Sequence, residues 1–149
     1  MRLVVVSSSG GVLLDMLALR PWLERHDVTW VAPPAADTEI LLRDERVHWR
    51  PERDGRDLTR LPLDVARAAR TLRAERADCV VSAGTGIAVS WFVAAAALRV
   101  PRLWFDTFNF VERPGKVARA CGRLASVVFT PRPSTDPSRR RSVAVGLLY

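Results

Sequence analysis

The sequence predicts an α/β fold with a doubly wound, mostly parallel sheet, and two observations lead to this prediction. Short runs rich in β-branched residues alternate with stretches of helical periodicity, which is the pattern of strand–helix–strand units. Several runs, such as LVVV at 3–6 and CVV at 79–81, are apolar at every position, as expected for central strands covered on both faces. With 149 residues and 48% hydrophobic content, the chain has the size of one globular domain, residues 1–149.

Each expected element follows from this alternation. The β-branched runs place strands at 2–7, 27–32, 45–50, 78–83, 101–106, 126–130 and 142–146. The segments between them place helices at about 12–25, 36–43, 60–76, 85–98 and 114–124. The segment PRPSTDPSRRR at 131–141 is expected to be a loop before the last strand.

Several classes of protein are disfavoured by the composition. The two cysteines, Cys79 and Cys121, and the two histidines share no ligand-like spacing, so we expect neither a metal site nor a disulfide, and buried thiols in a reducing cytoplasm. No signal peptide is visible. The longest apolar run, 87–98, has 12 residues, whereas a membrane-spanning helix needs ~20. It is expected to be a core helix, or to present Trp91 and Phe92 at a membrane-facing rim.

The net charge of +7 is concentrated in the last third of the chain. Residues 1–98 hold 13 Arg and 13 acidic residues, whereas residues 99–149 hold 10 Lys and Arg against three acids. Such one-sided charge indicates an anionic partner, such as lipid headgroups, a diphosphate or a nucleic acid, although genome composition alone can also produce it. A nucleic-acid partner is not expected, because the chain lacks aromatic interleaving or a recognition-helix motif.

A basic helix face is the best candidate for contact with a membrane. In the expected helix 114–124, Lys116, Arg119 and Arg123 share one face, opposite Val117, Cys121 and Leu124. Such a helix is suited to lie on an anionic membrane surface.

Two glycine turns are the candidate binding loops. Each follows a predicted strand and leads into a predicted helix, where free N–H groups favour anions. Neither is a Walker loop or a GxGxxG motif, so each could also be only a tight connection. The expected acceptor- or phosphate-binding residues are Ser8, Ser9, Gly10 and Gly11 in the first turn, and Ser82, Gly84, Thr85 and Gly86 in the second.

Five segments in order resemble one family over nearly the whole chain: SSSGG, LALRPWLERHDVTWV, ADCVVSAGTGIAVSWFVAAAALRVPRLWFDTF, GKVARACGRLASVVFTPRP and VAVGLLY. The family is the acceptor-side, membrane-recruiting subunit of bipartite UDP-sugar glycosyltransferases. It includes the subunit of the second N-acetylglucosamine transferase of dolichol-linked oligosaccharide assembly and its bacterial exopolysaccharide homologues.

The resemblance implies a Rossmann-like domain equivalent to the N-terminal half of a GT-B glycosyltransferase. It further implies a polyprenyl-diphosphate-linked acceptor, bound peripherally at the inner face of the cell membrane. A separate UDP-binding chain would supply the UDP-sugar donor site, so the chain alone would be inactive. No permanently bound cofactor is implied, and a role for a divalent metal is left open.

This chain departs from the family motif at the residue that follows the glycine pair, where relatives have a histidine that could accept a proton. Relatives resemble S-S-G-G-H, whereas Gly11 is followed here by Val12, which cannot accept a proton. Asp15, three residues later, and Asp106, at the end of a strand, are the remaining candidate catalytic residues, although either carboxylate could be structural. The base could instead come from elsewhere, or the chain could be a non-catalytic anchoring or regulatory homologue.

Overall fold

The structure is a computed structural model of the chain, and it describes residues 1–52, 59–106, 115–131 and 142–145. The strands are β1 (Arg2–Val6), β2 (Asp27–Ala32), β3 (Val47–Trp49), β4 (Cys79–Ser82), β5 (Arg102–Phe105), β6 (Val127–Thr130) and β7 (Ser142–Ala144). The helices are α1 (Gly11–Ala18), α2 (Arg20–Leu23), α3 (Ala36–Leu41), α4 (Leu61–Ala74), α5 (Ala88–Ala97) and α6 (Lys116–Leu124).

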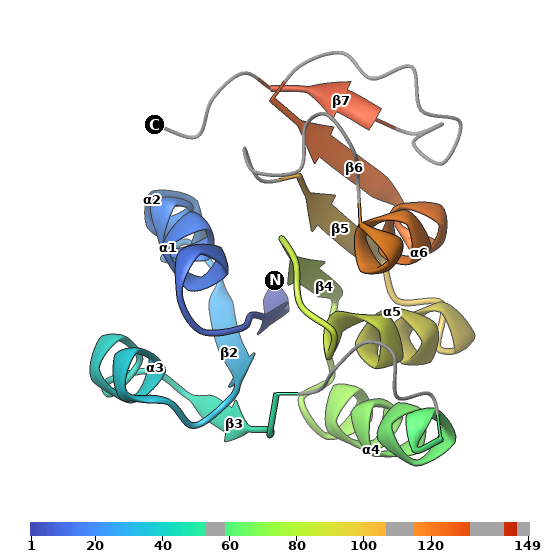
Figure 1. Cartoon of the computed structure of the whole chain (residues 1–149), viewed down its shortest axis with the longest axis horizontal. Helices are drawn as coiled ribbons and strands as arrows, with labels where there is room; N and C mark the ends of the chain where they lie inside the picture. Colours follow the sequence, from blue (N-terminus) through green and yellow to red (C-terminus); the bar gives the residue numbers. More distant parts are fainter. Residues whose placement is uncertain (53–58, 107–114, 132–141, 146–149) are drawn as a thin grey trace.

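The strands form one parallel sheet in the order β3-β2-β1-β4-β5-β6-β7. Helices α1–α3 cover one face, and α4–α6 cover the other (Figure 1). The chain winds from β1 outward to β3, and then returns past β1 to build the other half from β4 onward. The predicted doubly wound α/β fold is therefore confirmed, and β1 and β4 lie side by side where the winding direction changes.

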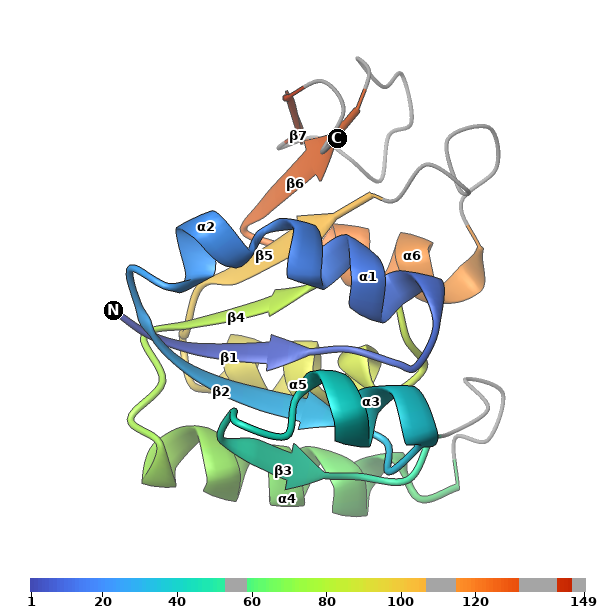
Figure 2. The ribbon, with the colours of Figure 1, turned by 90° about the vertical axis from the view of Figure 1, so that its left-hand side faces the viewer.

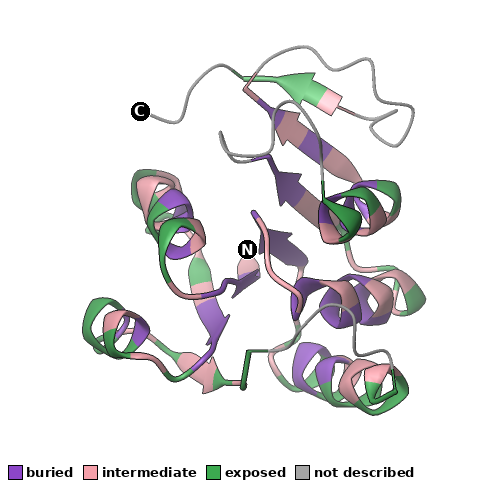
Figure 3. Ribbon diagram, viewed as in Figure 1, coloured by how far each residue is buried: buried purple, intermediate pink, exposed green. Residues whose placement is uncertain are grey.

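Two apolar clusters, one on each face of the sheet, form the core. Val4, Val6 and Val80 pack against α4 and α5, whereas Val5 and Val81 pack against α1. Neighbours in a strand point to opposite faces, so central strands between two helical layers must be apolar throughout. Figure 3 shows the buried residues concentrated on the strands and on the sheet-facing sides of the helices.

The first helix differs from the prediction. The expected helix 12–25 consists of α1 and the short α2, with Leu19 between them. Pro21 lies in the first turn of α2, where its missing N–H costs nothing, whereas the same proline inside a continuous helix would remove a backbone hydrogen bond. The prediction missed this break because the helical spacing of apolar residues continues across the point where the proline ends the first helix.

The boundaries of other elements also shift. Helix α5 begins at Ala88, three residues later than expected, after the glycine turn, and β3 and β7 are shorter than predicted. The predicted loop 131–141 lies outside the described residues except for Pro131.

The apolar run 87–98 forms a core helix. Trp91 and Phe92 in α5 are both buried and pack in the cluster that contains Trp104, so the alternative of a membrane-facing rim at these two residues is wrong. Within the described part of the chain, no helix is both long and apolar enough to cross a bilayer.

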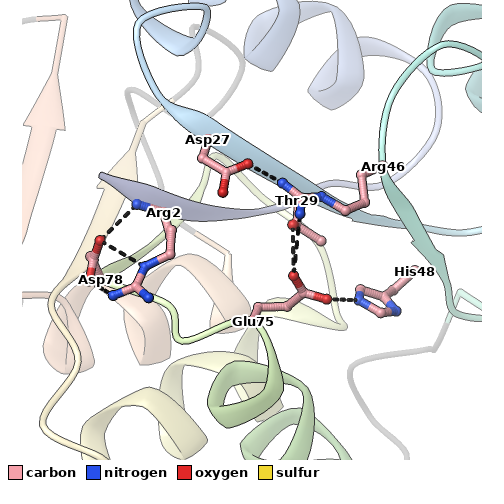
Figure 4. Close-up of polar contacts among 7 residues, drawn as sticks. All are labelled: Arg2, Asp27, Thr29, Arg46, His48, Glu75 and Asp78. Carbon is pink, nitrogen blue, oxygen red and sulfur yellow. Dashed lines mark hydrogen bonds and ion pairs between the residues drawn. The ribbon is translucent and has the colours of Figure 1, made fainter.

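A polar network joins the end of α4 to the edge of the sheet (Figure 4). Glu75 accepts a hydrogen bond from Thr29 of β2 at 3.3 Å, and its other oxygen lies 2.8 Å from Nε2 of His48 in β3. Arg46 lies between Glu75, 3.9 Å away, and Asp27, to which it is hydrogen-bonded. The network fixes α4 against β2 and β3.

A second ion pair holds β1 to the start of β4. Asp78 accepts hydrogen bonds from the backbone N–H of Arg2 and from its guanidinium, both at 2.8 Å (Figure 4). These hydrogen bonds lower the pKa of Asp78 to about 2.

Candidate functional site

The two glycine turns leave neighbouring strand ends. In the register of the parallel pair, Val6 of β1 lies opposite Ser82 of β4, so the chain leaves both strands at the same edge of the sheet. Figure 2 shows the arrows of β1 and β4 pointing to this edge, beyond which the chain turns back into α1. The two loops also approach each other, because a Cβ built on Gly84 would lie 3.7 Å from Cγ2 of Val12.

Two of the glycines have backbone angles that other residues rarely adopt. Gly10 has φ 70° and Gly84 has φ 149°. A side chain at either position would strain the backbone, so these turns require glycine. An isolated tight connection would require the same, so this geometry defines the loops without identifying what they bind.

The serine and threonine hydroxyls of the two turns form hydrogen bonds mainly with backbone groups of the same turn. Ser7 and Ser8 donate to the carbonyl oxygens of the residues that follow them. Thr85 accepts a hydrogen bond from the N–H of Ile87 at 3.4 Å, immediately before α5. The predicted residues Ser9, Gly11 and Gly86 lie at the surface or are half-buried in the same two turns.

Asp37 contacts the first turn, although the sequence did not indicate it. Its Oδ2 accepts a hydrogen bond from the backbone N–H of Gly10 at 2.6 Å. Asp37 lies in the first turn of α3, which follows β2, the other neighbour of β1. The sequence places Asp37 just after a predicted strand, which was the only indication of a role at the sheet edge. The two residues are 27 positions apart, so their contact could be recognised only from the folded structure.

Asp15 lies deeper than predicted. It is the fifth residue of α1, so it belongs to the second turn rather than to the first, and only 8% of its surface is exposed. Leu13 and Met16 of the same helix are fully buried in the core beneath α1. Asp15 therefore lies outside the first turn of α1, where a carboxylate would interact favourably with the helix N-terminus.

Asp106 lies at the end of a strand, as predicted. It follows β5 directly, and its N–H donates to the carbonyl of Phe129 at 2.8 Å. Its Oδ1 accepts a hydrogen bond from the indole Nε1 of Trp104 at 3.0 Å, and only 6% of its surface is exposed. The ring of Trp104 packs edge-on against Phe92 of α5, so the carboxylate lies on the face covered by α4–α6.

Buried hydroxyls follow the same edge. Ser82 ends β4 and Thr130 ends β6, and both hydroxyl oxygens are buried without a hydrogen-bond partner. The alternation of side chains along β4 and β6 places both on the face that Asp106 also occupies. Ser82 was predicted as a site residue, whereas Thr130 was not.

The three basic residues of α6 share the exposed face of the helix. Lys116, Arg119 and Arg123 are exposed, while Ala118 and Cys121 are buried against the sheet. The predicted two-sided character of this helix is confirmed, and its contact with a membrane stays a prediction.

The cysteines are not candidates for chemistry. Cys79 and Cys121 are free and buried, and burial raises the pKa of their thiols to about 11 and about 12. Among the residues that the structure describes, no group of three or more His, Cys, Asp or Glu side chains could hold a metal ion.

The fold and its strand-end turns define a class of domain. The chain is a Rossmann-like α/β domain with the fold of one half of GT-B proteins, as predicted. No protein-family model matches it, and no curated protein matches it.

Solved structures match almost the whole chain. MurG of Acinetobacter baumannii superposes with a TM-score of 0.78 at 21% identity, over 95% of this chain and 44% of MurG. The UDP-GlcNAc 2-epimerase of Neisseria meningitidis, bound to UDP-GlcNAc, superposes with a TM-score of 0.64 at 17% identity, over 88% of this chain and 40% of the epimerase. SsfS6, a glycosyltransferase of Streptomyces sp. SF2575, reaches a TM-score of 0.55 at 13% identity, over 93% of this chain and 53% of SsfS6. The chain thus spans about half, or less, of these proteins.

Proposed function

We propose that this chain is the acceptor-binding subunit of a two-chain glycosyltransferase. In this proposal it binds a polyprenyl-diphosphate-linked sugar at the inner face of the cell membrane, and a UDP-sugar-binding chain completes the enzyme. The observation that carries the proposal is the meeting of two glycine turns at the ends of β1 and β4. Ligands of open α/β sheets bind at such an edge, where the winding direction changes.

The two turns suit the diphosphate of such an acceptor. Gly10 and Gly84 present backbone without side chains, and α1 and α5 begin directly after the turns. Free backbone N–H groups at helix starts are favourable partners for phosphate oxygens.

Asp106 is better placed than Asp15 to act on the acceptor. In the transfer step the acceptor oxygen attacks the anomeric carbon of the donor, UDP leaves with the bonding electrons, and the acceptor proton passes to a base. Both carboxylates are buried, but Asp106 lies directly at the carboxyl edge of the sheet, whereas Asp15 lies in the second turn of α1. We therefore assign the contact with the acceptor hydroxyl to Asp106.

The donor half is proposed to come from a second chain. The match to the UDP-GlcNAc-bound epimerase supports a UDP-sugar as donor, and the shares of SsfS6 and of the epimerase that this chain spans leave room for a donor domain. The family resemblance assigns that domain to a separate polypeptide. The basic face of α6 would hold the pair at an anionic membrane.

A non-catalytic anchoring subunit is the second candidate. Val12 favours it, because the residue after the glycine pair cannot accept a proton, and its Cγ2 lies near Gly84 of the second turn. Such a chain would recruit its partner to the membrane without contributing to the transfer step.

Reconstitution distinguishes the two candidates. The purified chain, a UDP-binding glycosyltransferase half from a neighbouring reading frame, and their mixture are each given radiolabelled UDP-sugars and a polyprenyl-diphosphate-linked acceptor in vesicles. We expect transfer only by the mixture. A complex that forms but transfers at the rate of the partner alone would identify an anchor, and turnover by this chain alone would contradict the two-chain proposal.

A further inference from the structure

We propose that Asp37 determines which ligands the first glycine turn accepts, by occupying with its own carboxylate the position of an anionic ligand oxygen. The inference rests on the proposed function, in which this turn binds the acceptor diphosphate. The observation behind it is the hydrogen bond from the Gly10 N–H to Oδ2 of Asp37, 2.6 Å long.

The contact has the chemistry of a bound anion. A carboxylate oxygen that accepts from a backbone N–H forms a charge-assisted hydrogen bond, which is stronger than a neutral one. A phosphate oxygen would use the same donor in the same way. Because Gly10 has only one N–H, Asp37 and a ligand oxygen compete for it, and their like charges repel each other at that distance.

Displacement of Asp37 requires only a local change. The side chain is half-buried, and it lies in the first turn of a short helix whose packing rests on other residues. Thr38, next to it, is buried and bonds to the carbonyl oxygens of Pro33 and Ala35, which ties the start of α3 to the preceding loop without Asp37. The carboxylate can therefore rotate into solvent while the helix stays fixed.

The consequence is a selective first turn. A weakly held or singly charged anion does not displace the carboxylate. A diphosphate that also contacts the second turn gains enough binding free energy from those contacts to replace the hydrogen bond between Asp37 and Gly10. Asp37 thus favours ligands that engage both turns at once over free phosphate or diphosphate.

Inorganic pyrophosphate is the direct probe of this competition. Its affinity for the full chain is measured by calorimetry, and the amide resonance of Gly10 is followed by NMR, for the wild type, Asp37→Asn and Asp37→Ala. We expect both variants to bind pyrophosphate about tenfold more tightly, the scale of one charge-assisted hydrogen bond, with a larger shift of the Gly10 amide.

Glu39→Gln is the matched control. Glu39 is an exposed acid in the same first turn of α3, and no described hydrogen bond or ion pair joins its side chain to the glycine turn. The variant removes the same unit of charge from the same helix. It is expected to bind pyrophosphate within about twofold of the wild type, because exposed charges at a distance are screened by salt.

Each other outcome would contradict the inference, and each would point to a different explanation. Equal tightening by Glu39→Gln would attribute the effect to overall charge, and weaker binding by Asp37→Ala would show that the carboxylate orders the turn for its ligand. Unchanged binding in the Asp37 variants would refute the competition and leave the proposed function intact. No pyrophosphate binding by any of the proteins would refute the inference and also remove the diphosphate from the first turn.

Discussion

The indole Nε1 of Trp104 donates a hydrogen bond to Oδ1 of Asp106 at 3.0 Å, so an aromatic residue of β5 orients the carboxylate at the end of the same strand. Both side chains are buried, and the ring of Trp104 is itself held edge-on by Phe92. The core residues Trp104 and Phe92 therefore help to position this candidate carboxylate.

Removal of the Trp104 donor is expected to destabilise the protein. Trp104→Phe keeps an aromatic ring against Phe92 but leaves the buried carboxylate without this hydrogen bond, at a cost of about 1–3 kcal/mol in the free energy of unfolding. Urea denaturation measures the loss. Trp91→Phe, a buried tryptophan of the same cluster with no described hydrogen bond, is the control for ring size. Equal losses in both variants would show that the hydrogen bond contributes nothing.

The two candidate carboxylates are expected to differ in their effect on transfer. In the reconstituted two-chain enzyme, Asp106→Asn should reduce kcat by about 100-fold or more, the scale of general-base loss. Asp15→Asn should change kcat by less than about threefold, because Asp15 lies in the second turn of α1 rather than at the sheet edge. The reverse order of the two effects would move the base to α1.

Restoration of a base after the glycine pair is expected to raise activity. The side chain at position 12 lies beside Gly84, so an imidazole in Val12→His would reach the place where the two turns meet. We expect kcat of the reconstituted pair to rise by about tenfold, less than the roughly 100-fold of a fully positioned general base, because the rest of the site is not built around an imidazole. Val12→Gln, polar but unable to accept the proton, serves as the control, and an equal gain there would argue against proton transfer.

Neutralisation of the basic face of α6 is expected to weaken binding to anionic vesicles. With roughly 1 kcal/mol for each near-surface cation, conversion of Lys116, Arg119 and Arg123 to Gln should reduce binding at low salt by about 100-fold. Conversion of Arg67, Arg70 and Arg73 on α4 to Gln removes the same charge elsewhere. Vesicle sedimentation over a salt series measures both, and equal losses would show that only net charge matters.

The Arg2–Asp78 ion pair predicts a specific acid sensitivity. The pKa of Asp78 is lowered in the folded state to about 2 from 3.8, so its contribution to stability is complete above pH 4 and is lost as the pH falls through 2. Wild type and Asp78→Asn should therefore differ in denaturation midpoint at pH 5 and converge near pH 2. A difference that persists unchanged at pH 2 would rule out this ion pair as its cause.

The sequence by itself determined most of the strands and helices and the place of the two glycine turns. Apolar runs such as 3–6 and 79–81 can be satisfied only between two covering layers, which predicts central parallel strands. Glycines that interrupt a strand-to-helix junction predict loops at the carboxyl edge, where Gly10 and Gly84 lie. These properties are local, since they depend on side-chain period and on backbone freedom within a few residues.

Only the tertiary structure decided which of these residues meet. The contact of Asp37 with Gly10, the burial of Asp15, and the line of Ser82, Asp106 and Thr130 along one face all depend on strand order and on the depth at which each helix packs. Residues far apart in the chain are brought together because both faces of the sheet must be covered by helices. A local sequence pattern does not determine which helix covers which strands.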